Sequence, residues 1–329
     1  MDIYITLDYE LFFGPKSGSV EKCIIEPTEA LLKILDPHGI KANFFVDAGY
    51  LIALEKQKAE YQKLREDYIK VTTQIKDLAY NGHGIELHVH PHWEDSYYNG
   101  EKWVFDTSRY KLSDFEEDEV LDIVTNYTNV LKRIAGKSPV AYRAGGWSAQ
   151  PFSNIGRALK ANGVLIDSSV YPQGYYSSSN QSFDFRNVEP YQTDYKFSST
   201  LTEPDSKGDF QEIPISSIKV GPLFFWNFAF KKLKGSTEHN SIGDGAAVPM
   251  SKKEALRLMS SSSYSVVSID GFKISLIQKA LKNYIKKTAN EGSFVLIGHP
   301  KAFTPYSLKK LKNFVDVMAQ QHSFVVYSR

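Results

Sequence analysis

Short apolar segments alternate along this chain with longer segments in which apolar residues recur at helical spacing. The short segments predict strands at residues 3–7, 41–46, 84–89, 140–142, 164–166, 265–269, 294–298 and 324–327. The helical spacing predicts helices within residues 28–35, 51–80, 118–134, 152–161, 274–289 and 307–320. Because strands that alternate with helices are typical of parallel βα units, the pattern predicts an α/β fold.

One long region interrupts this alternation. Residues from about 172 to 264 are rich in Ser, Tyr, Asn and Pro, and we expect mostly long loops there, with one strand at residues 211–215. Loops of this length in a compact domain usually have a function or are disordered. The sequence contains no internal repeat and no linker, so we expect residues 1–329 to form a single domain with an insertion at about 172–264.

Composition and charge remove several classes of protein. The apolar fraction of 42% and the charged fraction of 23% are those of a globular protein and exclude a disordered, collagen-like or coiled-coil chain. The net charge is +1, from 39 Lys and Arg against 38 Asp and Glu, which speaks against a nucleic-acid-binding function. Cys23 is the single cysteine, which excludes a disulfide framework and any site built from several cysteines.

The first residues do not resemble an export signal. Such a signal needs a basic start and an apolar core, whereas this chain begins with Asp2, Asp8 and Glu10 among its first ten residues. No apolar run approaches the roughly 18–20 residues that cross a membrane. We therefore expect a soluble cytoplasmic protein.

Reactive side chains follow several of the predicted strands. In a βα barrel, the side chains at the carboxyl ends of the strands meet at one face and form the site. Here these ends carry Asp8, Glu10, His88, His90, His92, Arg143, Asp167 and His299. This recurrence is a stronger indication of a site than any single residue.

The three histidines indicate a metal site. His88 and His92 are spaced i, i+4, which places both imidazoles on one face of a helical turn, and in an extended chain His90 would share their side. Imidazole suits zinc and similar ions, and a nearby carboxylate would complete a set of three protein ligands. The alternative is histidines that pack or face solvent; three of the eight histidines within five residues favour a metal or catalytic use. The role of His90 stays open.

The remaining candidates each have a chemical use and a structural alternative. Asp8 and Glu10 lie on the same side of an extended chain, so one could bind metal while the other accepts a proton. Arg143 could hold a carboxylate through its planar guanidinium or form a structural ion pair. The imidazole of His299 could protonate a leaving group near neutral pH, or be buried for packing. Asp167 could take part in the site or simply form a turn with the two serines after it.

Five segments, in this order, resemble the polysaccharide deacetylases of the NodB-homology group, the family-four carbohydrate esterases. Residues 6–10 (TLDYE) resemble the family's Thr-Phe-Asp-Asp opening, and residues 40–46 (IKANFFV) its Lys-Ala-Thr-Phe-Phe-Val strand. Residues 81–92 (NGHGIELHVHPH) resemble its Asn-Gly-His-Glu-Ile-Gly-x-His-x-x-x-His segment. Residues 143–147 resemble its Arg-Pro-Pro-Tyr turn, and residues 296–299 its terminal Leu-x-His. The resemblance covers most of the chain outside residues 172–264.

This resemblance implies a distorted (β/α) barrel of seven or eight strands and a metal-dependent deacetylation of glycans, with zinc as the expected ion. It implies that His88 and His92 bind the metal, that Asp8 is the base and His299 the acid. It further implies that Arg143 orients the base, and Asp167 lies near the position of an aspartate that supports this arginine.

The sequence also departs from the family pattern. Tyr9 stands where many members have the metal-binding aspartate, but the Asp8-x-Glu10 opening resembles an acid-x-acid form that some members use. A phenol is protonated at neutral pH and is a poor ligand, so we expect Glu10 to be the third metal ligand. The other departures are Gly145 and Gly146 in place of the two prolines, and Val89 in place of a Ser or Thr.

Together these observations predict a deacetylase that acts on an N-acetylated sugar of a polysaccharide or of its lipid-linked or nucleotide-linked precursor. Three alternatives remain: a non-metal amide or imide hydrolase on the same fold, a glycosidase, and a glycan-binding protein with a decayed catalytic site. A glycosidase needs two carboxylates that flank a sugar bond and would leave the histidines unexplained. The sequence does not set the oligomeric state.

Overall fold

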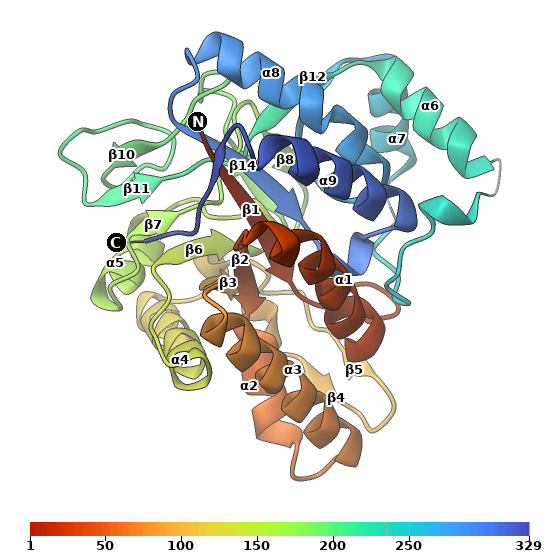
Figure 1. Ribbon diagram of the computed structural model, residues 1–329. Coiled ribbons are helices and arrows are strands. Elements are labelled where there is room, and N and C mark those ends of the chain that lie inside the picture. The colour runs from red at the N-terminus through yellow and green to blue at the C-terminus, as the bar shows by residue number, and fades with distance from the viewer. Residues whose placement is uncertain (234–235, 250, 329) are drawn as a thin grey trace.

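A curled sheet forms the centre of the structure, a computed structural model that describes residues 1–233, 236–249 and 251–328 (Figure 1). The order of its hydrogen-bonded strands is β10-β11-β7-β6-β3-β2-β1-β14, and β15 also pairs with β1. Neighbouring strands are parallel except for the antiparallel pair of β10 and β11. The eight parallel strands and the helices around them form the predicted α/β fold.

The strands of this sheet are short and mostly buried. They are β1 (Asp2–Tyr9), β2 (Asn43–Asp47), β3 (Gly84–Val89), β6 (Ala141–Ala144), β7 (Ile166–Asp167), β10 (Tyr195–Phe197), β11 (Phe210–Glu212), β14 (Ser293–Gly298) and β15 (Ser323–Phe324). Three small two-stranded sheets pair β4 (Tyr97–Tyr98) with β5 (Trp103–Val104), β8 (Tyr175–Ser177) with β9 (Ser182–Asp184), and β12 (Ser217–Val220) with β13 (Ser263–Val266).

Helices cover the outside of the curled sheet (Figure 1). They are α1 (Glu26–Leu35), α2 (Ala48–Gln57), α3 (Gln62–Tyr80), α4 (Glu117–Ala135), α5 (Ser153–Ala161), α6 (Pro222–Leu233), α7 (Lys252–Ser260), α8 (Ile277–Lys287) and α9 (Pro305–Met318). The ends of α4 follow from its sequence. A capping box of Glu116 and Glu119 begins it, and Gly136, at a φ of 77°, ends it in the left-handed conformation that glycine adopts most readily.

β1 is the strand that positions the site. It pairs with β2 on one side, where Asp8 is opposite Phe45, and with β14 on the other, where Leu7 is opposite Gly298. In the neighbouring ladder His88 of β3 is opposite Arg143 of β6. This register brings the carboxyl ends of β1, β3, β6 and β14 to one edge of the sheet, as the sequence predicts.

The barrel closes irregularly. After β11, the backbone N–H of Ser216 donates to the carbonyl of Val295 in β14. The N–H of Val267 then donates to the carbonyl of Ser216, and that of Ile297 to the carbonyl of Val267. Isolated hydrogen bonds therefore replace a regular ladder at this seam, which confirms the prediction of a distorted (β/α) barrel.

The insertion is more ordered than the sequence predicts. The strand expected at residues 211–215 is present as β11, but α6, α7 and the strands β8, β9, β10 and β12 also lie within residues 172–264. The strand expected at residues 265–269 is divided: residues 263–266 form β13 and pair with β12, whereas Ser268 forms an isolated parallel bridge with Ile297 of β14. Within the described part of the chain, no helix is long and apolar enough to cross a membrane.

Candidate active site

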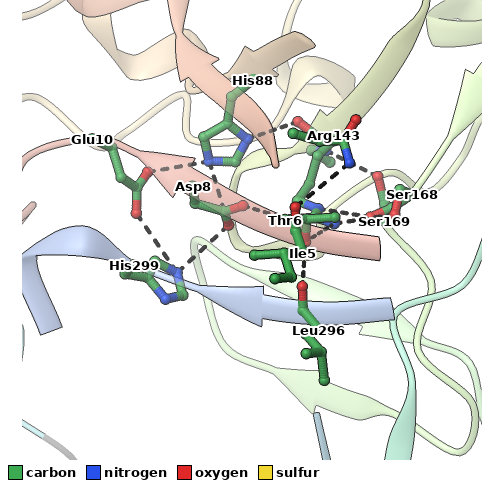
Figure 2. A network of polar contacts seen from close by, with 12 residues as sticks. Ile5, Thr6, Asp8, Glu10, His88, Arg143, Ser168, Ser169, Leu296 and His299 are labelled. Carbon is green, nitrogen blue, oxygen red and sulfur yellow. Dashed lines mark hydrogen bonds and ion pairs between the residues drawn. The ribbon is translucent and has the colours of Figure 1, made fainter. Parts of the chain in front are cut away.

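Two carboxylates and three imidazoles meet at the edge where β1, β3 and β14 end. Figure 2 shows Asp8, Glu10, His88 and His299 of this group. Asp8 Oδ2 lies 3.8 Å from His88 Nε2 and 3.5 Å from His299 Nε2. Glu10, directly after β1, lies 3.1 Å from His88 and 2.7 Å from His90 through Oε2. The carboxylates and His88 and His90 are almost fully buried, so the energy of their charges depends strongly on these contacts.

Glu10, His88 and His90 have the spacing of metal ligands. The Nε2 atoms of the two histidines are 3.1 Å apart, and Glu10 Oε2 lies within 3.1 Å of both. Ligand atoms around a tetrahedral ion with bonds of about 2.0–2.1 Å lie about 3.3 Å apart, close to this arrangement. Two imidazole nitrogens and one carboxylate oxygen suit zinc and similar divalent ions, so the residues present fit a metal.

The hydrogen bonding of His88 also suits metal binding through Nε2. Its Nδ1–H donates to the carbonyl oxygen of Arg143 at 2.9 Å, which leaves the lone pair on Nε2 once the ring is neutral. Burial opposes a charge on His88, but Asp8 and Glu10 outweigh it and raise its pKa to about 9. Burial and the charge of His88 lower the pKa of His90 to about 4, so His90 is neutral and has no proton to lose before it binds an ion.

His92, a metal ligand in our sequence prediction, lies outside this group. Its side chain is fully buried among Phe13, Trp93 and Tyr110, and neither ring nitrogen has a hydrogen-bond partner. The reason is local: the strand ends at Val89, and Pro91 begins a 3₁₀ turn that rotates the chain before the third histidine. We therefore replace His92 by His90 in the proposed ligand set.

Gly145 makes room for His90. A Cβ atom at residue 145 would lie 2.5 Å from His90 Nδ1 and 2.6 Å from its Cε1, far closer than atoms can approach. Gly146, at a φ of 57°, continues the turn in a conformation that suits glycine. Gly145 therefore leaves the space that His90 needs to approach Glu10.

Arg143 holds Asp8, as the sequence predicts. Its Nη1 donates to Asp8 Oδ1 at 2.6 Å (Figure 2). The guanidinium also lies 4.0 Å from the centre of the Phe45 ring. Burial would raise the pKa of Asp8, but Arg143, followed by His88 and His299, lowers it below its ordinary value. Asp8 is therefore ionised, with one oxygen held and the other directed toward the histidines.

No hydrogen bond joins Asp167 to Arg143, and the supporting role of Asp167 stays a prediction. The guanidinium instead donates to the carbonyl and the hydroxyl of Ser168, at 2.8 and 3.1 Å. Asp167 accepts hydrogen bonds from the backbone and hydroxyl of Ser169. Because side chains alternate along an extended segment, Asp167 faces away from the side on which Ser168 meets the arginine.

His299 is paired with a carboxylate that the sequence analysis missed. Its Nδ1–H donates to Asp270 Oδ2 at 2.7 Å, and its backbone N–H donates to Asp270 Oδ1 at 2.8 Å. Burial would lower the pKa of His299, but Asp270, followed by Asp8 and Glu10, raises it above its ordinary value. The Nε2 of His299 is directed toward Asp8 Oδ2, at 3.5 Å.

A buried lysine, Lys301, is the second residue that was missed. Its Nζ donates to Glu10 Oε1 at 2.9 Å and to the carbonyl oxygen of Leu11. Although burial would raise the pKa of Glu10, Lys301 and the two histidines hold it well below its usual range. Lys301 fixes one oxygen of Glu10, so that the other is turned toward His88 and His90.

The carboxylates of Asp8 and Glu10 and the imidazoles of His88, His90 and His299 line a cavity of about 120 Å³. The aromatic part of its wall comes from Phe13, Tyr110 and Trp147, and Gly146 lies beside them. A space of this size admits a group of a few heavy atoms together with a water molecule.

Comparisons with known proteins concern the fold. Neither a scan against protein-family models nor a search of curated proteins finds a match. Among solved structures, a GH57 branching enzyme from Thermococcus kodakaraensis is 11% identical, with 99% of this chain and 70% of that chain covered and a TM-score of 0.51. An allantoinase is 13% identical over 100% and 87% of the two chains, with a TM-score of 0.49. A polysaccharide deacetylase from Bacillus cereus is 12% identical over 100% and 92%, with a TM-score of 0.42. At 11% identity, the likeness to the branching enzyme concerns the fold alone.

Proposed function

We propose that this chain is a metal-dependent deacetylase that hydrolyses the acetyl group of an N-acetylated sugar. Zinc is the expected ion, bound by Glu10, His88 and His90. The expected substrate is a polysaccharide or its lipid-linked or nucleotide-linked precursor, and the expected location is the cytoplasm. The residues from 1 to 329 would act as one catalytic domain, with residues 172–264 as an insertion.

One observation carries the proposal. A base held by an arginine, an acid held by a carboxylate, and three residues with metal-ligand spacing surround one small cavity. Amide hydrolysis needs these three parts: a group that activates water, a group that stabilises the oxyanion, and a group that protonates the amine. The choice of an N-acetylated sugar as the substrate is inferred from the five ordered segments that resemble polysaccharide deacetylases.

In the reaction, water adds to the acetamide carbonyl and the C–N bond then breaks to give acetate and the free amine. A divalent ion, when bound, would polarise the carbonyl and lower the pKa of the water. Asp8 accepts the proton of the water at Oδ2, since Arg143 occupies Oδ1. His299 donates a proton from Nε2 to the departing nitrogen, and Asp270 stabilises the charged imidazole through Nδ1.

The roles of the two carboxylates can be separated by substitution. We expect Glu10→Gln to weaken metal binding sharply, and Asp8→Asn to abolish turnover while the ion stays bound. Glu29→Gln, at an exposed position on α1, is the matched control. Metal content is measured by elemental analysis and turnover by acetate release. If Asp8→Asn loses the metal and Glu10→Gln retains it, the assignment is reversed.

The same assay tests the acid. We expect His299→Ala to lower kcat by about 10²–10⁴-fold with unchanged metal content. His322→Ala, in a histidine away from the site, should leave both quantities unchanged. Full turnover in protein that contains no metal would contradict the proposal and favour a non-metal amide or imide hydrolase. Tight glycan binding by metal-loaded protein without acetate release would favour a glycan-binding protein.

A further inference from the structure

Two helices of the insertion expose large apolar side chains. On α6, Leu223, Trp226 and Phe230 follow helical spacing on one face and are 78%, 56% and 59% exposed. Leu256 on α7 and Val248 before it are 69% and 70% exposed. Side chains of this size rarely gather on a surface that only water contacts. We call Leu223, Trp226 and Leu256, on the adjacent helices α6 and α7, the apolar face.

The rest of the protein holds α6 in place from the opposite side. Phe224 and Phe228 stack on Phe272, with ring centres 5.2 and 6.0 Å apart. The indole N–H of Trp226 donates to the carbonyl of Met259 in α7 at 3.0 Å, so the one polar atom of this side chain is satisfied within the protein. The exposed apolar groups therefore belong to an anchored pair of helices. In Figure 1, α6 and α7 lie together at the periphery of the molecule.

Exposed lysines lie beside Leu256 of the apolar face. Between residues 219 and 257, the described side chains include five Lys and Arg against three Asp and Glu. Lys219, Lys252 and Lys253 are exposed, and Lys252 lies one helical turn from Leu256 on α7. Of the three acidic residues, Glu254 is paired with Arg257.

We propose that α6 and α7 dock on an anionic lipid bilayer, with the apolar face in the interfacial region and the lysines on the headgroups. Aromatic residues beside lysines are the pattern of helices that lie in the membrane interface. A second copy of this chain fits the surface less well, because a two-fold contact would set the same basic patch against itself.

The docking surface lies next to the site from two directions. Phe272, beneath α6, is two residues from Asp270, which holds His299. On the other side, the charges of Arg257 and Glu254 on α7 act on the pKa of Tyr171, which burial raises. The ring of Tyr171 packs on Trp147 in the cavity wall. A protein bound through this surface would hold its cavity near the headgroups. This would suit a lipid-linked sugar, a consequence that rests on the proposed function, although the docking itself does not.

Sedimentation with lipid vesicles tests the proposal on the full chain. We expect binding to phosphatidylcholine vesicles that contain about 30% phosphatidylglycerol, and binding weaker by about tenfold or more to phosphatidylcholine alone or in about 0.5 M salt. Trp226 fluorescence should shift to the blue on binding, and Trp226→Phe should remove most of that shift. The triple change Leu223→Ser, Trp226→Ser and Leu256→Ser should lower the partition coefficient by at least about tenfold. The control is Ile69→Ser, a comparably exposed apolar side chain on α3.

Charge reversal gives an independent variant. Lys252→Glu with Lys253→Glu should weaken binding to the anionic vesicles, and acidic residues in the first turn of α7 favour the helix, so folding is not at risk. Absence of binding to anionic vesicles, or binding that neither set of variants weakens, would overturn the proposal. So would a dimer in sedimentation velocity that the serine variants dissociate, without vesicle binding. Acetate release from a water-soluble substrate is measured separately, so a failure of the proposed activity would leave the vesicle result intact.

Discussion

Replacing Lys301 by methionine would leave a buried carboxylate without its cation. The methionine keeps most of the length of the lysine but not its charge. In the parent protein the ammonium lies 2.9 Å from Glu10 Oε1 and is itself only 7% exposed, so water cannot readily take its place. We expect the metal-free variant to be markedly less stable.

The structure sets the size of this loss. At 2.9 Å and an effective dielectric constant of about 20, the attraction between the two charges is about 6 kcal/mol. Desolvation of the lysine offsets part of it, and removal of one partner from a buried pair typically costs about 3–5 kcal/mol. Because His88 and His90 still contact the other oxygen of Glu10, we expect the lower end, about 3 kcal/mol.

Urea unfolding of metal-free protein at pH 7 measures the effect. Lys312→Met, which breaks the exposed pair with Asp316, is the control and should cost less than about 1 kcal/mol. In a double-mutant cycle, Glu10→Gln together with Lys301→Met should recover about 2 kcal/mol relative to the sum of the single changes. If Lys301→Met costs no more than the control, or if the cycle shows no coupling, the ammonium does not hold Glu10 as described.

Three further changes probe other contacts. Gly145→Ala should displace His90 and weaken zinc binding by about 10–100-fold in calorimetric titration. The control is Gly221→Ala, where a Cβ meets nothing closer than 3.9 Å and zinc affinity should not change. If Gly145→Ala leaves the zinc affinity unchanged, His90 is not a ligand. Arg143→Lys keeps the charge but loses the planar fork, so kcat should fall by about tenfold or more with little change in KM, and a rise in KM alone would indicate contact with substrate instead. Burial raises the pKa of Glu86 to about 7 from 4.5, so the native state binds the extra proton and stability falls as the pH rises from about 4.5 to 7. Glu86→Gln should remove about 2–3 kcal/mol of that fall in unfolding experiments at pH 5 and pH 8, and an unchanged slope would contradict the assignment.

The sequence predicts those parts of the site that depend on one strand end. Asp8, Arg143 and His299 each follow an apolar run, and parallel strands bring such ends together whatever the details of packing. Glu10 and His88 come from the same rule. The alternation of side chains along β3 also places His90 beside His88. We assigned the second histidine ligand to His92 instead, because its spacing from His88 matches the family pattern.

The contacts that were not predicted join segments far apart in the chain. Asp270 follows an irregular segment after β13, and Lys301 lies in the 3₁₀ turn after β14; only the closed barrel brings Lys301 to Glu10. The α6 helix was missed because its sequence, PLFFWNFAF, is apolar on every side and lacks the alternation of apolar and polar residues that marks an amphipathic helix. Its exposed face is evident only from the structure.

The position of β1 in the sheet has a consequence for biosynthesis. This first strand pairs with β14, and the hydroxyl of Thr6 donates to the carbonyl of Leu296, 290 residues later. During synthesis, at roughly 5–20 residues per second, the edge of β1 that pairs with β14 therefore stays unpaired until residues 293–298 have emerged from the ribosome. Asp8 and Glu10 are the first site residues to leave the ribosome, and His299 and Lys301 are the last. The reaction centre therefore cannot assemble before residues 299–301 have been synthesised.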